Sequence, residues 1–249
     1  MSGHSKWATI KRKKAATDQA RGKMFSKYIK EITIAARHGG GDLEANPRLR
    51  TAVATAKAVN MPASNIERAI KRGSGDVDGV HYEETHYEGY GPGGAAILVE
   101  VATDNRNRTT GDVRHTFTKY GGKLGEAGSV AHLFKPCGLI LVDRGAVPED
   151  ALIEAALEAG ADDVEVGDET YEIVTPQARL EAVREALAAR KIPVASAEVT
   201  KISSLRVPVD GREAETLLKL VDALEDHDDV QRVHSNFDVS DEVMARLSR

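Results

Sequence analysis

The sequence has few of the residues on which disulfides, metal clusters and membrane spans depend. Cys137 is the only cysteine among 249 residues, so neither an internal disulfide nor a cysteine-based zinc cluster can form. No apolar run reaches the ~18 residues of a membrane span, and no apolar segment of a secretory signal follows the basic N-terminus. Aromatic residues make up only 4% of the chain. We therefore expect a cytoplasmic protein with aliphatic cores and no membrane partner.

Motifs of common enzyme classes are also scarce. No G-x-x-x-x-G-K-[ST], H-E-x-x-H or G-x-S-x-G sequence occurs. A formal G-x-G-x-x-G is present at Gly89, Gly91 and Gly94, but it precedes an expected strand and contains Pro92, whereas a dinucleotide site needs it between a strand and a helix. A structural turn is favoured there. We predict no catalytic residue, no cofactor and no metal, so an enzyme is the least supported class.

Charge is distributed unevenly along the chain. Residues 1–75 contain 16 Lys and Arg against 5 Asp and Glu, while residues 76–249 contain 18 against 34. The modest overall charge of −5 therefore combines a basic N-terminal segment with an acidic remainder. Such asymmetry points to a polyanionic partner that contacts one end of the protein.

The basic charge is densest in residues 2–30, where nine cations face one acid, Asp18. A solvated helix face is the alternative interpretation, but a run of this length favours nucleic acid, whose phosphates release counterions when they are neutralised. Trp7, the only tryptophan, can stack on a base or anchor the segment. The residues predicted to contact nucleic acid here are Lys6, Trp7, Lys11, Arg12, Lys13, Lys14, Arg21, Lys23 and Lys27.

Apolar spacing predicts three short helices after this basic arm, at about 25–36, 47–59 and 62–73. Asn46-Pro47 has the form of an N-cap followed by proline at the first helical position. The glycine-rich residues 73–79 are typical of a linker. The predicted first domain is therefore helical and covers residues 1–75.

Beyond the linker, strands and helices alternate. Residues 136–203 predict the order βαββαβ of a ferredoxin-like domain. The flanking segments each predict βαβ, with strands near 95–103, 129–134, 205–209 and 230–237, and together they supply a second such unit. The predicted fold is α+β: a three-helix domain, a discontinuous domain of residues 80–135 plus 204–249, and a domain of residues 136–203 inserted into it.

The sequence DNRNRT at residues 104–109 joins an expected strand to an expected helix. Arg106 and Arg108 can hold a phosphate against free backbone N–H groups, and we include them among the predicted nucleic-acid contacts. The alternative is a helix cap whose arginines pair with the acidic remainder of the chain. Both interpretations stay open. The acidic residues 225–229 lack the pattern of a calcium loop and are expected to form a solvated turn.

Several motifs resemble those of one known family. GHSKWATIKRKKAATDQARGKMFSKYIKEI at the start, YEGYGPGG, DNRNRT, GGKLGEAGSVAHLF and LEDHDDVQ occur in order along nearly the whole chain. Together they resemble the YebC/PmpR family. The resemblance implies a cytosolic bacterial protein with a helical domain and two α/β domains, one inserted in the other. Members are described as DNA-binding transcriptional regulators, a mitochondrial relative as a translational activator, and bacterial members are tied to ribosome function.

The sequence thus predicts a non-enzymatic nucleic-acid-binding factor that acts in gene expression. We favour ribosomal RNA, and with it the ribosome, as the partner of the basic N-terminal domain, because nothing resembles a recognition-helix module for the DNA major groove. A DNA-binding transcriptional regulator is the alternative. The oligomeric state is not encoded in any motif.

Overall fold

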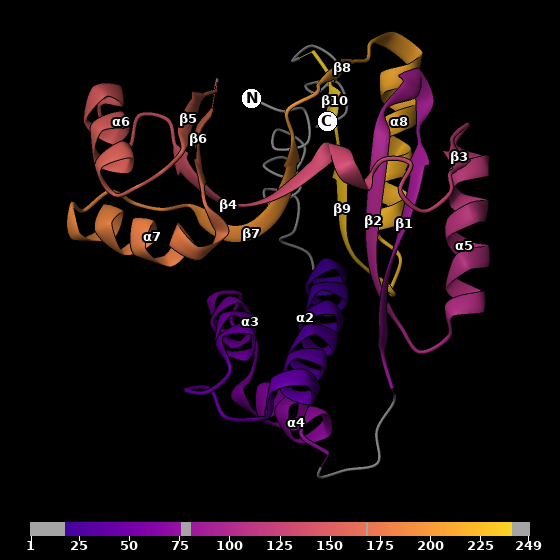
Figure 1. Cartoon of the computed structure of the whole chain (residues 1–249), viewed down its shortest axis with the longest axis horizontal. Helices are drawn as coiled ribbons and strands as arrows, with labels where there is room; N and C mark the ends of the chain where they lie inside the picture. Colours follow the sequence, from indigo (N-terminus) through magenta and orange to yellow (C-terminus); the bar gives the residue numbers. More distant parts are fainter. Residues whose placement is uncertain (1–17, 76–80, 168, 241–249) are drawn as a thin grey trace.

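The structure is a computed structural model that describes residues 18–75, 81–167 and 169–240. These residues form a helical unit and two α/β units, which lie around a common centre (Figure 1). Each unit has its own aliphatic core. The α+β class and the order of a helical region followed by two β-containing regions are confirmed. The exact domain boundaries stay a prediction.

The helical unit consists of three helices, as the apolar spacing predicted. They are α2 (Asp18–Gly39), α3 (Pro47–Ala58) and α4 (Ala63–Gly73). Asn46 caps α3 by accepting a hydrogen bond from the Leu49 N–H at 3.0 Å, and its amide donates back to the carbonyl of Ala35 on α2 at 2.8 Å. One buried side chain therefore fixes both the start of α3 and its position on α2. Helix α2 already begins at Asp18, so Lys23 and Lys27 lie on a helix rather than on an arm.

The main sheet has four strands in the order β3-β1-β2-β9. Its elements and the helices on its apolar face are β1 (Glu83–Tyr90), β2 (Ala96–Thr103), α5 (Arg106–Lys119), β3 (Lys123–Leu124), α8 (Gly211–Glu225) and β9 (Val230–Ser235). Val99, Val113, Phe117 and Leu217 are fully buried between sheet and helices. Strand β9 comes from the end of the described chain, yet it pairs antiparallel with β2.

The inserted sheet has the ferredoxin-like order that the sequence predicted. Its strands follow the order β5-β6-β4-β7, with every neighbouring pair antiparallel. Its elements are β4 (Phe134–Asp143), α6 (Glu149–Glu158), β5 (Asp163–Val166), β6 (Thr170–Thr175), the short helix η3 (Gln177–Arg179), α7 (Leu180–Ala189) and β7 (Ser196–Ser203). Helices α6 and α7 cover one face of this sheet over Ile140, Val142 and Ile173.

The main sheet differs from the predicted second βαββαβ unit. Strand β1 was not predicted, because Glu84, His86 and Glu88 alternate along one of its faces and remove the apolar signal. The strand expected near 129–134 is a 3-10 turn, η2 (Ala131–Leu133), directly before β4. The strand expected near 205–209 is reduced to β8 (Val207–Pro208), which pairs with β10 (Phe237–Asp238) outside the main sheet.

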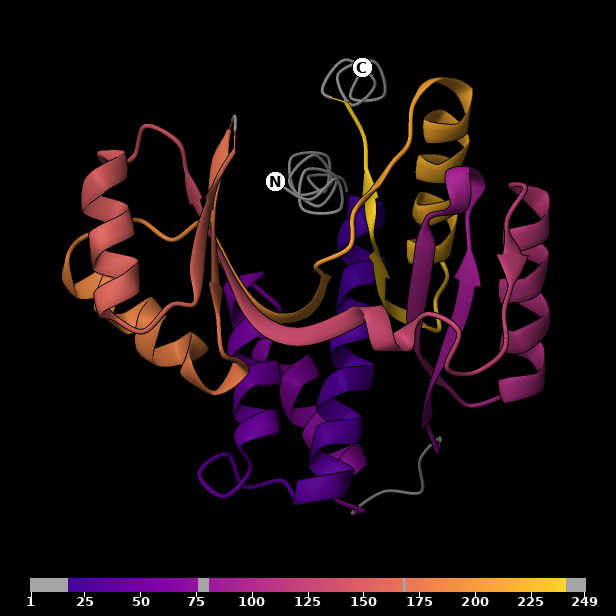
Figure 2. The same cartoon turned by 45° about the horizontal axis from the view of Figure 1, so that its top comes forward.

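Strands β4 and β7 connect the two α/β units. They pair along their whole length, from Leu141 opposite Ser196 to Phe134 opposite Ser203. Figure 2 shows both strands curving from the inserted sheet towards the main sheet, above the helical unit. The inserted unit is therefore joined through a paired ribbon rather than through two separate loops.

The contact between α2 and α4 depends on Gly73. A Cβ atom at this position would lie 2.3 Å from the backbone oxygen of Thr33 on α2, which no real side chain tolerates. We expect Gly73→Ala to lower the free energy of unfolding by about 1–3 kcal/mol, because the helices must separate. The matched control is Gly111→Ala on α5, where an added Cβ meets nothing within 4 Å.

Urea denaturation of both variants measures this effect. Alanine is the better helix former, so Gly111→Ala should gain about 0.5–1 kcal/mol. Equal changes in the two variants would contradict the packing argument.

Candidate nucleic-acid interface

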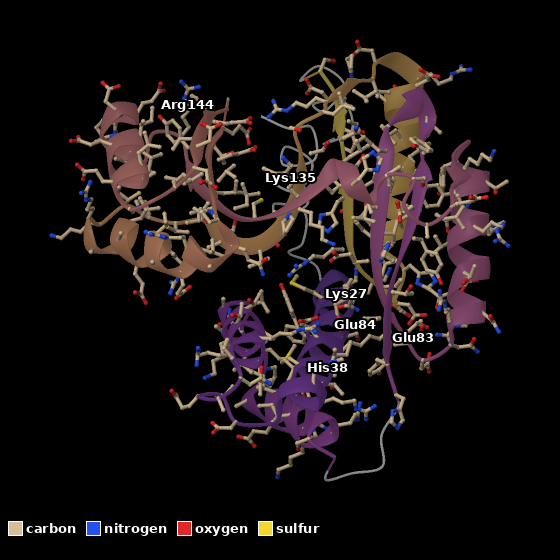
Figure 3. The ribbon with its side chains drawn as sticks, in the orientation of Figure 1. Lys27, His38, Glu83, Glu84, Lys135 and Arg144 are labelled. Atoms are coloured by element: carbon tan, nitrogen blue, oxygen red, sulfur yellow. The ribbon has the colours of Figure 1, made fainter. Side chains whose placement is uncertain are left out.

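Three lysines on one face of α2 contact the C-terminal end of α8. Lys27 Nζ donates to the carbonyl of Glu225 at 2.6 Å, Lys30 Nζ donates to the carbonyl of Asp228 at 2.9 Å, and Lys23 Nζ lies 3.1 Å from the Asp226 carboxylate. The last carbonyls of a helix lack intrahelical donors and carry the negative end of the helix dipole. The Lys27 ammonium, labelled on α2 in Figure 3, therefore caps α8. The three lysines together attach the helical unit to the end of α8 and the turn after it.

Asp229 is the centre of this attachment. Its carboxylate is only 6% exposed and accepts from Lys30 Nζ at 2.7 Å, from Arg108 at 2.8 Å and from the Thr109 hydroxyl at 2.8 Å. Burial alone would raise the pKa of Asp229, but hydrogen bonds from Lys30, Arg108 and Thr109 outweigh it and hold the pKa far below its usual range. One carboxylate thus joins α2 to the start of α5.

Residues 225–229 include the helix-to-strand turn that we expected from the sequence, and Asp226 and Asp228 are exposed in it, but the turn is not solvated throughout. Asp229 is buried, and the backbone carbonyls around it accept from the lysines of α2. The opposite charges of the two segments were visible in the sequence. Their separation of about 200 positions concealed that they meet.

Arg106 and Arg108 lie where α5 begins. Asn105 caps the helix by accepting from the Arg108 N–H at 3.1 Å, while the Arg108 guanidinium bonds Asp104 and Asp229 and that of Arg106 bonds Glu83. The structure therefore contains the helix cap and the pairing of both arginines with acidic residues, which together were one of the two interpretations left open. The side chains of Arg106 and Arg108 stay 60% and 49% exposed, and their contact with a phosphate stays a prediction.

The remaining predicted contacts fall at the edge of the described chain. Lys23 and Lys27 are placed on α2 and bonded to the residues after α8, as given above. Arg21 lies within α2, but its side chain is outside the described part of the structure. The others lie outside the described residues: Lys6, Trp7, Lys11, Arg12, Lys13 and Lys14.

The YEGYGPGG segment of β1 organises the loop that leads to the inserted sheet. The Glu88 side chain is 1% exposed, and its carboxylate accepts from the N–H groups of Gly128, Val130 and Ala131, each at 2.7 Å. Burial opposes ionisation of Glu88, but the three backbone donors outweigh it and lower its pKa. The Tyr90 hydroxyl donates to the carbonyl of Ser129 in the same loop at 3.1 Å.

The glycines of that segment allow close packing. A Cβ at Gly91 would lie 2.6 Å from Leu217 of α8, and Gly93 has φ = +70° against Val209. Gly91 to Gly94 form a tight connection between β1 and β2, not the strand-to-helix turn that a dinucleotide needs. The structural turn favoured from the sequence is confirmed.

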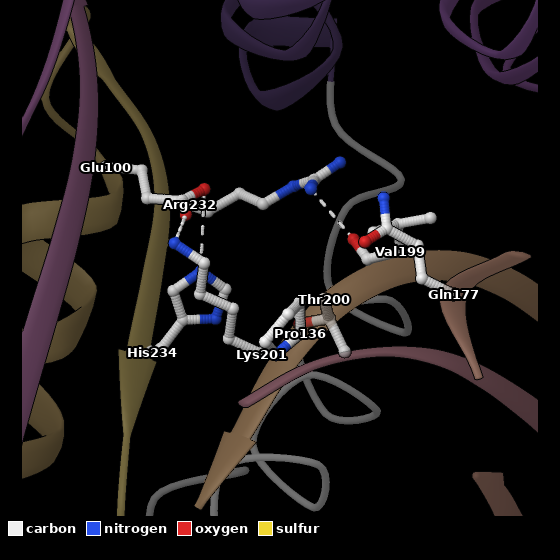
Figure 4. A pocket seen from close by; sticks show the side chains of 8 residues that line it. All are labelled: Glu100, Pro136, Gln177, Val199, Thr200, Lys201, Arg232 and His234. Atoms are coloured by element: carbon white, nitrogen blue, oxygen red, sulfur yellow. Dashed lines mark hydrogen bonds and ion pairs between the residues drawn. The ribbon is translucent and has the colours of Figure 1, made fainter. Parts of the chain in front are cut away.

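A small pocket of about 140 Å³ lies where β7 meets the main sheet (Figure 4). Glu100 of β2 bonds Lys201 of β7 at 2.5 Å and lies 3.5 Å from the buried His234, while Arg232 of β9 donates to the carbonyl of Val199 at 2.7 Å. Burial opposes ionisation of Glu100, yet contacts with His234 and Lys201 lower its pKa to about 2. These charged groups hold the two sheets together.

Two negative findings apply to the described residues alone. Residues 18–75, 81–167 and 169–240 contain no group of three or more His, Cys, Asp or Glu side chains placed to hold a metal ion. In the same residues no helix is long and apolar enough to cross a membrane.

The fold and the attachment described above define a three-part α+β protein in which a basic helical unit is fixed to an acidic remainder. The sequence matches two family models, described as the TACO1/YebC protein N-terminal domain over residues 5–76 and the TACO1/YebC second and third domain over residues 82–237. The chain belongs to the TACO1/YebC family.

Curated relatives agree in length and in name. A protein of Dictyoglomus turgidum is 55% identical over 249 residues, covering all of both chains, and one of Geobacter sulfurreducens is 58% identical over 247 residues, covering 99% and 100%. Both are named probable transcriptional regulatory protein, which makes this a family of gene-expression regulators. The crystal structure of a conserved hypothetical protein from Aquifex aeolicus is similar with a TM-score of 0.82 and 48% identity over 91% of this chain and 94% of that one.

The charge on Glu88 can be tested by substitution. Glu88→Gln keeps the shape of the side chain but replaces one accepting oxygen with an amide donor that opposes a backbone N–H. We expect the free energy of unfolding to fall by about 1.5–3 kcal/mol, the usual worth of buried hydrogen bonds to a charged group. The control on the same strand, Glu83→Gln, breaks only an exposed pair with Arg106 and should cost less than about 1 kcal/mol. A similar loss in both variants would contradict a special role for Glu88.

The depressed carboxylate pKa values predict acid sensitivity. Glu88, Glu100 and Asp229 all titrate lower in the folded protein than their unfolded values of about 4. Their contribution is therefore complete above about pH 5 and is lost as the pH falls from about 4 towards 2. Urea midpoints should fall between pH 5 and pH 2, most steeply below about pH 4, and Glu100→Gln should show a shallower drop. A midpoint that stays constant over this range in the unmodified protein would refute the prediction.

Proposed function

We propose that this chain is a non-enzymatic nucleic-acid-binding factor, a ribosome-associated translational activator of the cytoplasm that contacts RNA through its basic N-terminal part. The observation that supports it most is the segregation of charge: 16 basic against 5 acidic residues up to position 75, and 18 against 34 beyond it. Membership of a family of gene-expression regulators agrees with a nucleic-acid partner.

The attachment of α2 fixes where the basic part of the protein lies relative to the acidic units. Because Lys23, Lys27 and Lys30 are bonded to the residues after α8, the helical unit has a fixed orientation on the main sheet. The acidic units then repel phosphate and confine a polyanion to the basic end. A protein built in this way places a folded acidic body at a set distance from the RNA that it binds, which suits occupation of a ribosomal site.

DNA binding is the second candidate, and one feature of the helical unit favours it. Helices α3 and α4 are joined by residues 59–62 alone, with Asn60 in the left-handed conformation at φ = +60°. This connection has the length of the turn in a helix-turn-helix. The names of the curated relatives point to transcription as well.

Sedimentation of cell lysate tests the proposal. The full-length protein is compared with a variant in which Lys11, Arg12, Lys13 and Lys14 are changed to Ala, and with a control that loses equal charge from the acidic units through Arg184→Ala, Arg190→Ala, Lys191→Ala and Lys219→Ala. We expect the unmodified and control proteins to migrate with ribosomes after deoxyribonuclease treatment, and the first variant to stay at the top of the gradient.

The other outcomes decide between the candidates. If the unmodified protein stays at the top but binds promoter fragments more tightly than random DNA, the transcriptional function replaces the translational one. If it binds neither ribosomes, RNA nor DNA at 50 mM salt, the proposed function is wrong.

A further inference from the structure

The cations of the helical unit point in two directions. Those of α2 are bonded to the acidic residues after α8, as described above. Arg68, Lys71 and Arg72 belong to α4, whose buried face, with Ile66, Ala69 and Gly73, packs against α2 at Thr33. None of the nucleic-acid contacts predicted from the sequence lies on α4.

Helix α4 is sharply divided into an apolar and a basic face. Its buried residues lie on one side, and at the spacing of a helix Arg68, Lys71 and Arg72 share the opposite side. All three side chains are exposed. The only acid on this helix is Glu67, and within the described residues Arg68, Lys71 and Arg72 take part in no ion pair with any acidic side chain.

Arg68 is held in place by its own helix. Its Nε donates to the carbonyl of Ser64 at 3.2 Å, and its terminal nitrogen bonds the amide oxygen of Asn65. The guanidinium is thus oriented along the surface without being neutralised. Lys71 and Arg72 in the last turn also complement the helix dipole, but that effect does not account for Arg68 in the middle of the helix.

The distance from the acidic units matters for a phosphate partner. Helix α4 packs on α2 at Thr33. The end of α8 and the acidic residues after it contact α2 at Lys23, Lys27 and Lys30. Charges separated by more than the Debye length of about 8 Å at physiological salt are largely screened. Asp226 and Asp229 are also paired with Lys23 and Lys30, which reduces their repulsion of a polyanion on α4.

We propose that the outer face of α4, with Arg68, Lys71 and Arg72, is a second contact surface for the phosphate backbone of nucleic acid, separate from the basic residues 6–14. This inference rests on the proposed function, since it adds a surface to the same helical unit. Each cation contacts one phosphate, without reading the base sequence. RNA and DNA share this chemistry, so both are probes in the test.

The test measures binding of the full chain to a fluorescent RNA hairpin and to a DNA duplex of matching sequence, by anisotropy between 50 and 200 mM salt. The test variant carries Arg68→Ala, Lys71→Ala and Arg72→Ala. Its control removes three exposed cations from the main unit through Arg114→Ala, Lys119→Ala and Lys123→Ala. Loss of three phosphate contacts should make the slope of log K against log salt less negative by about 2 to 3, whereas the control should keep the original slope.

A charge-preserving variant, Arg68→Lys with Arg72→Lys, separates electrostatics from folding. It should bind like the unmodified protein, and thermal melts should agree for all variants because the changed side chains are exposed. The inference is overturned if the α4 variant keeps the original slope, or if the slope of the Arg114, Lys119 and Lys123 control changes as much as that of the α4 variant. Binding that disappears only when Lys11 to Lys14 are changed leaves the proposed function standing and removes α4 from it. An unmodified protein that binds neither probe removes both. A larger effect on the RNA hairpin than on the DNA duplex identifies RNA as the source of the phosphates.

Discussion

The arrangement of the three units depends on how buried carboxylates are satisfied. Asp229 can stay ionised only because Lys30 of α2 and Arg108 of α5 reach it together, and removal of either donor would leave a buried charge partly unpaired, which is costly. The helical unit is therefore fixed on the main sheet by electrostatics rather than by a shared apolar core. Its own core and that of the main sheet are separate clusters.

Carboxylates also attach other parts of the chain to the face of the main sheet that α5 and α8 leave free. Three glutamates on that face each bind a different part of the chain: Glu84 bonds Arg48 of α3, Glu100 bonds Lys201 of β7, and Glu88 binds the loop before β4. This pattern explains why an acidic protein needs acids at these positions. These glutamates bind the neighbouring units of the protein. None of them pairs with Arg68, Lys71 or Arg72 of α4, which have no acidic partner among the described residues.

Local patterns in the sequence predicted most of the elements and the ferredoxin-like insert, because helix periodicity, the Asn46-Pro47 cap and aliphatic strands such as β4 are encoded by neighbouring residues. Strand β1 was not predicted because the face of the sheet away from α5 and α8 carries Glu84 and Glu88 there. Both glutamates bond partners that are distant in the sequence, and Glu88 is buried. The site was predicted in part for the same reason. Basic charge was visible at Lys23 and Lys27, but their bonding to the end of α8 is a long-range fact. Arg68, Lys71 and Arg72 were visible as cations, and only the packing of α4 showed which way they face.

The late position of β9 in the chain has a consequence for synthesis. Strand β2 pairs with β1 as soon as the hairpin is made, but its other edge waits for β9. At usual translation rates of about 5–20 residues per second, the stretch between Thr103 and Val230 takes on the order of 10 s to make. During this interval an aliphatic strand keeps one open edge, which is a hazard for aggregation. The inserted unit, whose strands all lie within this stretch, can fold in the meantime. The strand that completes the main sheet is thus the last of its four strands to emerge from the ribosome.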